Sequence, residues 1–318
     1  MLSQRFASVV ILTFCLSMVT KAQSPGAALD AFNRGRERYA RGDLDRAIAD
    51  FTAAIDLSSR SLGVPHSGPP KMKAESAFTA SDRPENRVAT IDPFTAVAYV
   101  GRSLALRAKG DLEGAFEDSD RAIAIDPGLP EAYNSRGCAR FAKRDFDGAL
   151  ADFNKAIDID PLNSDAYNNR ANASVAKGDL ESGLADFDRA IALDPRRAEI
   201  YYNRGQLRGD RGDMDGALSD AERAIELNSR LSEAFHLRGM VHYYQKDLQR
   251  AVADFDHAIA LNPHFARAYG NRGFVRLLQG QDAKAREDFA QCLKLDPALK
   301  PRLDQQLEAL KKQRETAR

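Results

Sequence analysis

The sequence predicts an all-α protein built as a solenoid of antiparallel helix pairs. The first observation is spacing, since six prolines lie on one 34-residue grid whose single vacant slot holds Ser229. A fixed period of this length is typical of arrays in which each unit stacks on its neighbours. The second observation is that apolar residues return every three to four positions on either side of a Gly-Asp pair, as in residues 165–195. The grid prolines are Pro93, Pro127, Pro161, Pro195, Pro263 and Pro297.

Residues 1–22 have the pattern of a secretory signal peptide. Arg5 gives a basic start, an apolar run covers residues 7–19, and small side chains at Thr20 and Ala22 precede Gln23. The run is shorter than the roughly 18 residues that a spanning helix usually needs. We therefore expect cleavage and export, to the periplasm of a bacterial source or to the outside of the cell. An uncleaved anchor, which would bring membrane contact, is the alternative.

Within each unit, two amphipathic helices are expected, joined by a short turn. The turn carries glycine in most units, because a left-handed residue ends a helix there without steric cost, and Arg144 and Lys246 depart from this pattern. With proline counted as position 32, positions 20 and 27 hold small residues, whereas positions 4 and 24 are mostly aromatic. Large side chains can therefore fill small slots between helices. The Asp-Pro pair ends the second helix.

This pattern resembles the tetratricopeptide repeat family, whose unit has an aromatic residue at 4, Gly at 8, Ala at 20, an aromatic residue at 24, Ala at 27 and Pro at 32. The resemblance covers residues 28–61 as a first repeat and residues 96–299 as six tandem repeats. Ser103 and Ala171 replace the glycine at position 8, and both are small enough to keep the packing. The resemblance implies a right-handed superhelical solenoid whose first helices line a concave groove for a protein or peptide partner.

Two segments depart from the repeat. Residues 62–95 keep the period, but Pro65, Pro69 and Pro70 forbid a first helix and Pro84 interrupts the second. We expect a decayed or remodelled repeat there, mostly a surface loop with a short helix near residues 85–91. It would be either a flexible spacer or a loop that folds over the groove or onto a partner.

Residues 300–318 follow the last repeat. The leucines at 303, 307 and 310 share one helical face, which predicts a capping helix. The helix would end in a basic, solvated tail, and docking through that tail is the alternative.

Arginine occupies position 7 and aspartate position 23 in every clear unit. Because both positions lie on helices expected to pack together, we predict ion pairs within a unit or across the junction to its neighbour. Such a ladder would fix repeat stacking, and an arginine row that binds an acidic ligand is the alternative. The first pair is Arg34 with Asp50. The others are Arg102 with Asp118, Arg136 with Asp152, Arg170 with Asp186, Arg204 with Asp220, Arg238 with Asp254, and Arg272 with Asp288.

The resemblance also assigns a candidate partner groove, since positions 2, 5, 9, 12 and 13 point into it in the family. The middle of this groove is polar in the present sequence, and its later part is apolar and aromatic. Aromatic and methionine side chains supply contact area, and asparagine can bind an extended backbone. Unconstrained variation at these positions is the alternative. The candidates are Asn134, Asn168, Asn172, Tyr202, Gln206, His236, Met240, Tyr243, Tyr244 and Phe274.

The sequence offers no sign of catalysis or of a cofactor. It contains no HExxH, GxSxG, GxxxxGK[ST] or GxGxxG motif and no pair of CxxC sequences for zinc. His236 and His242 are six residues apart, a poor spacing for sharing a metal. Cys138 and Cys292 are more than four repeats apart and are not expected to form a disulfide.

Composition narrows the class of partner. With 46 basic and 46 acidic residues, the chain has no general attraction to nucleic acid. We expect an exported, non-catalytic scaffold that binds a peptide or protein segment in its groove. The alternatives are an organising subunit of a cell-envelope complex that acts through its convex face or ends, and, more remotely, an enzyme with an unrecognised site.

Overall fold

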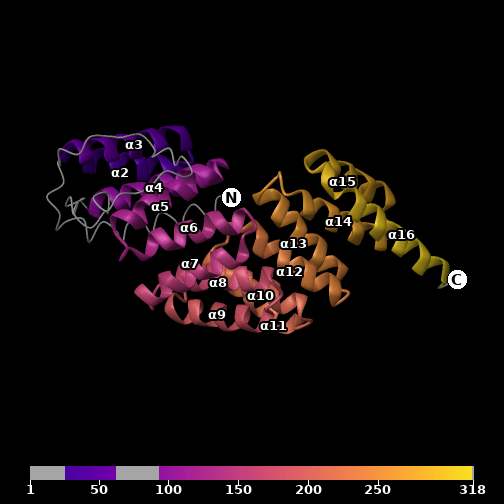
Figure 1. Ribbon diagram of the computed structural model, residues 1–318. Coiled ribbons are helices and arrows are strands. Elements are labelled where there is room, and N and C mark those ends of the chain that lie inside the picture. The colour runs from indigo at the N-terminus through magenta and orange to yellow at the C-terminus, as the bar shows by residue number, and fades with distance from the viewer. Residues whose placement is uncertain (1–25, 62–92, 317–318) are drawn as a thin grey trace, which may run out of the picture. The chain divides into compact units, whose positions relative to one another are not determined.

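The computed structural model describes residues 26–61 and 93–316, and all regular structure over these residues is helical (Figure 1). The chain divides into two compact units, Met1–Gly183 and Leu184–Arg318. The predicted signal segment and the predicted short helix at residues 85–91 lie outside the described residues.

In the first unit, successive helices pack as antiparallel neighbours. Each first helix packs on the second helix of its own pair, and that second helix packs on the first helix of the next pair. The helices are α2 (Gly26–Arg41), α3 (Leu44–Ser61), α4 (Pro93–Lys109), α5 (Leu112–Ile125), α6 (Pro130–Ala142), α7 (Phe146–Ile159) and α8 (Ser164–Ala176). The boundary between the units falls within α9 (Leu180–Leu193).

The second unit repeats this arrangement and ends in a longer helix. Its helices are α10 (Ala198–Asp210), α11 (Met214–Leu227), α12 (Ser232–Tyr244), α13 (Leu248–Leu261), α14 (Ala266–Leu278), α15 (Asp282–Leu295) and α16 (Lys300–Thr316), with a 3-10 turn, η3 (Pro297–Leu299), before the last. Leu303 of α16 is buried, and Leu307 and Leu310 of the same helix are half-buried. Among the described residues, no helix is long and apolar enough to cross a bilayer.

The turn inside each pair follows from two local rules. The residue after the first helix has a positive φ, which costs nothing at Gly110 (φ 96°) but places Lys246 in a conformation disfavoured for a residue with a Cβ (φ 64°). In most pairs an aspartate follows and caps the second helix, as when Asp213 accepts a hydrogen bond from the backbone N–H of Gly216 at 2.9 Å. The Asp-x-Asp-Gly sequences at residues 145–148 and 213–216 therefore cap helices through their first aspartates. No group able to hold a metal ion occurs within the described residues.

A close approach between a glycine and a phenylalanine sets the packing inside most pairs. A Cβ built on Gly137 of α6 would lie 2.6 Å from the ring of Phe153 on α7, so glycine at position 8 lets the two helices of this pair approach closely. The repeat at residues 96–129 uses another solution, because position 24 there is Ser119. Ser103 Oγ donates to the carbonyl of Ala115 at 2.7 Å and lies 2.8 Å from the hydroxyls of Ser119 and Ser135.

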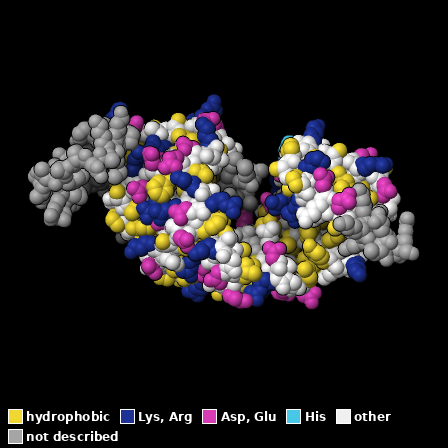
Figure 2. Space-filling model, turned by 45° about the vertical axis from the view of Figure 1, so that its right-hand side comes forward, with side chains coloured by type: hydrophobic (Ala, Val, Ile, Leu, Met, Phe, Trp, Pro, Cys, Tyr) yellow, Lys and Arg dark blue, Asp and Glu magenta, His cyan; other side chains and the backbone are white. Residues whose placement is uncertain are grey.

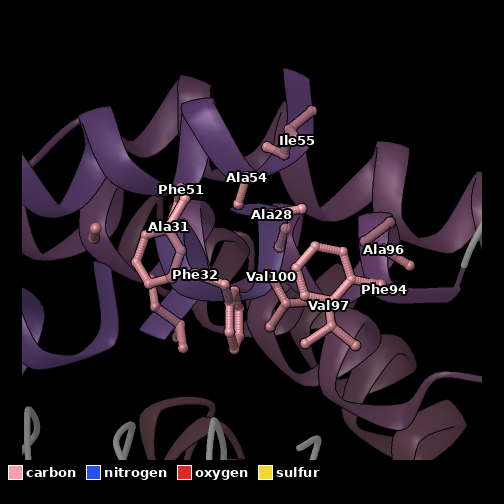
Figure 3. Packing of buried hydrophobic residues seen from close by; sticks show 14 of the residues in the cluster. Ala28, Ala31, Phe32, Phe51, Ala54, Ile55, Phe94, Ala96, Val97 and Val100 are labelled. Carbon is pink, nitrogen blue, oxygen red and sulfur yellow. The ribbon is translucent and has the colours of Figure 1, made fainter. Parts of the chain in front are cut away.

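The junction between α3 and α4 is packed although residues 62–92 intervene in the chain. The ring of Phe32 on α2 meets Phe51 of α3 and Phe94 of α4 edge-on, at centroid distances of 5.5 and 5.6 Å (Figure 3). All three rings are fully buried. At the same junction, the hydroxyls of Ser58 and Thr95 lie 2.8 Å apart. Helix α3 is therefore covered by α4, as α5 is covered by α6.

Candidate functional site

The polar groove candidates of the first unit form hydrogen bonds with neighbouring residues of that unit. Asn169 Nδ2 on α8 donates to Asn134 Oδ1 on α6 at 3.0 Å and to Cys138 Sγ at 3.4 Å. Asn134 is buried, with 5% of its surface exposed. Asn172 Nδ2 donates to the backbone carbonyl of Asn168 at 2.9 Å. An asparagine at position 6 thus ties positions 5 and 9 of the preceding repeat, which leaves Asn134 little capacity to bind a partner.

The second unit contains the same bridge with different residues. Asn271 Nδ2 on α14 lies 2.8 Å from Nε2 of His236 and 3.0 Å from Sδ of Met240, both on α12. Burial, together with the positive charge of Arg267, lowers the pKa of His236 to about 4. His236 is therefore neutral at pH 7, and its Nε2 can accept the hydrogen bond from Asn271.

Five of the predicted groove residues line one cavity of about 690 Å³ in the second unit. This volume lies within the roughly 300–1,000 Å³ that is usual for ligand sites. The five are Gln206, His236, Met240, Tyr244 and Phe274. The cavity also has walls that the sequence did not indicate, from Arg267 and Asn271 on α14, Cys292 on α15, and Arg302 and Leu303 on α16.

A second cavity of about 260 Å³ adjoins the first and shares Met240, Tyr244 and Phe274 with it. It adds Tyr243, whose ring lies 5.4 Å from that of Tyr244, and Leu278. Tyr244 and Leu278 are 58% and 37% exposed, so the walls present apolar surface to solvent. Tyr202 lines neither cavity, and burial, with the charge of Glu233, raises its pKa to about 12.

The arginines at position 7 pair with the aspartates at position 23 of their own repeats. Arg102 Nε and Nη2 donate to the two carboxylate oxygens of Asp118 at 2.6 and 2.9 Å, which is a bidentate pair. The corresponding Nη2 donations to Asp152, Asp220, Asp254 and Asp288 measure 2.6 to 2.7 Å. Arg34 lies 3.5 Å from Asp50. Arg170 and Asp186 belong to different units, and Arg170 donates to Asn154 Oδ1 at 2.7 Å.

Five of the ladder arginines have two further partners that sequence reasoning missed, and these are Arg102, Arg136, Arg170, Arg204 and Arg272. One is an acceptor at position 25 of the preceding repeat, as when Arg204 Nη1 donates to Asp188 Oδ1 at 2.7 Å. The other is the aromatic ring at position 4, since the guanidinium of Arg204 lies 5.6 Å from the ring centre of Tyr201. Burial alone would lower the pKa of Arg204, but its hydrogen bonds with Asp220 and Asp188 raise the pKa above its ordinary value.

A second arginine joins the ladder in alternate repeats. Arg140, Arg208 and Arg276 at position 11 each donate through Nη1 to the aspartate at position 23, at 2.8 to 2.9 Å. In the repeat between the last two, position 11 is His242, whose Nε2 lies 3.7 Å from Asp254. The ladder therefore joins both helices of a repeat to the helix before them. Because its aspartates are buried, it holds the stack together and leaves few acceptors for a ligand.

The comparisons with known proteins agree with this architecture. A tetratricopeptide repeat protein from Parabacteroides merdae has a TM-score of 0.58 at 17% identity and covers 88% of this chain and 98% of its own. Pseudomonas aeruginosa PilF has a TM-score of 0.59 at 18% identity, and PilW, described as a widely conserved type IV pilus biogenesis factor, has 0.59 at 19%. Each covers 67% of this chain, with 96% of PilF and 98% of PilW matched. These likenesses show the fold alone, and no curated protein matches the chain.

Family models give the assignment by sequence. Two models described as tetratricopeptide repeats match residues 134–195 and 170–231, and residues 232–265 and 266–299. The matched residues run from 134 to 299, more than half of the 318 residues. Together with the helix pairs and the glycine and phenylalanine packing, this shows that the chain belongs to the tetratricopeptide repeat family.

Proposed function

We propose that the protein is an exported, non-catalytic scaffold that binds a peptide or protein segment in the groove of its second unit. Repeats of this family mediate protein–protein interaction. We place the binding site in the second unit because five of the predicted groove residues line its cavity of about 690 Å³. The signal-like pattern of residues 1–22 supports export.

The chemistry of the walls favours a peptide over a small polar metabolite. Tyr244, Met240 and Phe274 give an apolar surface that is partly open to solvent, and Gln206 adds an exposed amide. Aromatic and methionine side chains are enriched at the cores of protein interfaces, where they bury much apolar area. The groove of the first unit is a weaker candidate, since Asn134 is buried and bound by Asn169.

Selection from a random peptide library on the immobilised full chain tests the proposal. We expect enriched peptides for the wild type and loss of enrichment for Tyr244→Ala with Phe274→Ala, because these changes remove most of the aromatic wall. Leu261→Ala is the matched control, since Leu261 is a large exposed apolar residue of the same unit that lines neither cavity. Equal enrichment by the wild type and the cavity variant would show that the groove is not the binding surface.

A further inference from the structure

The residue at position 2 of the repeat, one of the positions assigned to the groove, changes from acidic to basic at the last repeat. Position 2 of four consecutive repeats is acidic, at Glu131, Asp165, Glu199 and Glu233. The next repeat places Arg267 there, and α16 places Arg302 one position further along. Both arginines line the 690 Å³ cavity. The change of sign therefore coincides with the cavity.

These two arginines differ from those of the ladder because no carboxylate holds them. The ladder arginines Arg204 and Arg272 are largely covered, and each donates to two aspartates. Arg267 and Arg302 are exposed, and neither forms an ion pair with any described residue. Asp210 is the one acidic residue among the described residues that line the cavity, and it is the C-terminal residue of α10. The cavity therefore has an excess of positive charge.

The backbone adds to this charge. Arg267 and Arg302 lie in the first turns of α14 (from Ala266) and α16 (from Lys300), where the partial positive charge of a helix is greatest. The apolar side chains of Met240 and Phe274 line the same cavity. A ligand that satisfies both features carries a carboxylate next to an apolar side chain.

We propose that this cavity binds an acidic segment of a partner protein, in which an Asp or Glu side chain lies beside an aromatic or long aliphatic residue. Its carboxylate pairs with Arg267 and Arg302, and the apolar side chain packs on Met240 and Phe274. The inference rests on the proposed function and names the kind of segment that the groove takes. Arginine suits this role because its planar fork can bind a carboxylate through two hydrogen bonds.

A library of random peptides fused at their C-termini tests the choice of ligand, because every carboxylate that its random segment offers is a side chain. We expect the wild-type full chain to enrich peptides with Asp or Glu next to Phe, Leu, Ile or Met. Arg267→Gln with Arg302→Gln should keep the apolar preference and lose the acidic one. Arg286→Gln is the matched control, an exposed arginine of the same repeat that lines neither cavity.

A double-mutant cycle on one enriched peptide then locates the carboxylate. Changing its acid to the matching amide, or both arginines to glutamine, should each weaken binding about tenfold to a hundredfold, and the two together no further. Enrichment of apolar peptides without acids, or unchanged affinity of the arginine variant, would overturn this inference and leave the groove function standing. Failure of the wild type to enrich anything beyond the Tyr244→Ala and Phe274→Ala variant would overturn both.

Discussion

Lys109 Nζ lies 2.5 Å from a carboxylate oxygen of Asp45, a residue 64 positions earlier in the chain. The same pair of positions meets at the next junction, where Lys143 Nζ lies 2.6 Å from Glu113, only 30 positions earlier. The extra separation equals one 34-residue period. Helix α3 therefore meets α4 in the register of an ordinary junction, and one whole period of the sequence is bypassed.

This bypass predicts that residues 62–92 can be shortened without loss of the stack. The hydroxyls of Ser58 and Thr95 are 2.8 Å apart, so the two helix ends are close enough for a short connection. We expect an eight-residue Gly/Ser linker to keep cooperative unfolding, measured by circular dichroism. It should raise the free energy of unfolding by about 1 kcal/mol through reduced loop-closure entropy.

A 31-residue Gly/Ser replacement of the same segment is the control, because it removes the sequence while keeping the length. A lower melting temperature in both variants would mean that residues 62–92 themselves stabilise the array. A lower value in the short variant alone would mean that the helix ends need the longer connection.

The ladder predicts that replacing one of its buried aspartates lowers the free energy of unfolding substantially. Asp220 is 2% exposed and accepts hydrogen bonds from Arg204 at 2.6 and 2.9 Å and from Arg208 at 2.9 Å. Asp220→Ala leaves two guanidinium groups short of a partner in a covered site, which should cost about 2–4 kcal/mol in urea unfolding. Changing Arg204 and Arg208 to leucine as well should recover part of this loss.

Glu226→Ala supplies the comparison, since Glu226 accepts from Arg223 at 2.9 Å on an exposed surface. Exposed pairs contribute little, so we expect a change below about 0.5 kcal/mol. Figure 2 shows Lys and Arg interspersed with Asp and Glu over the face in view, which is the setting of such exposed pairs. If Asp220→Ala cost no more than Glu226→Ala, the ladder would not stabilise the stack.

The sequence predicted the helix pairs, and ion pairs between positions 7 and 23 either within a repeat or across a junction, because the residues responsible recur at fixed positions. Through its extra prolines it also indicated that residues 62–95 depart from the repeat, but it could not indicate that α3 meets α4 in the register of an ordinary junction, since that depends on packing. The hydrogen bonds from ladder arginines to position 25 of the preceding repeat were also missed. Their acceptor varies, being Thr52, Asp120 or Asn154 in different repeats.

Prediction of the groove was limited by contacts across the junctions. Asn134 was expected to face a partner, but the acceptor it offers is used by Asn169, an interaction that depends on how closely two repeats approach. Arg267 was overlooked among mostly acidic residues at position 2, and Arg302 lies outside the repeat numbering. The sequence thus indicated the apolar wall of the cavity and missed its charge.

Two helical glycines of the second unit should respond to alanine in opposite directions. A Cβ on Gly239 would lie 2.8 Å from the ring of Phe255 and 3.2 Å from Asp254 Cβ, so Gly239→Ala should cost about 1–3 kcal/mol. A Cβ on Gly209 would meet only Ala217 Cβ at 3.7 Å, an ordinary contact. Gly209→Ala should therefore gain about 0.5–1 kcal/mol from helix propensity. Urea unfolding of both variants checks the pair, and equal effects would contradict the packing described for position 8.

His236 predicts how the stability of the second unit changes with pH. Its pKa is about 4 in the folded protein, against about 6.5 when unfolded. Between these values the unfolded state binds the proton more readily, so the free energy of unfolding falls as pH decreases from 6.5 towards 4. Protonation would also place an N–H of His236 against the amide of Asn271, which now donates to Nε2 at 2.8 Å.

Because the ring is partly exposed, we expect this residue to contribute on the order of 1–2 kcal/mol across that range. Urea unfolding at pH 7.5, 6.0 and 4.5 should show a smaller decline for His236→Gln than for the wild type. His264→Gln, at an exposed histidine of the same unit, should follow the wild type. Parallel declines in all three proteins would mean that the proton is taken up elsewhere, since the carboxylates common to them also titrate near the lower end of the range.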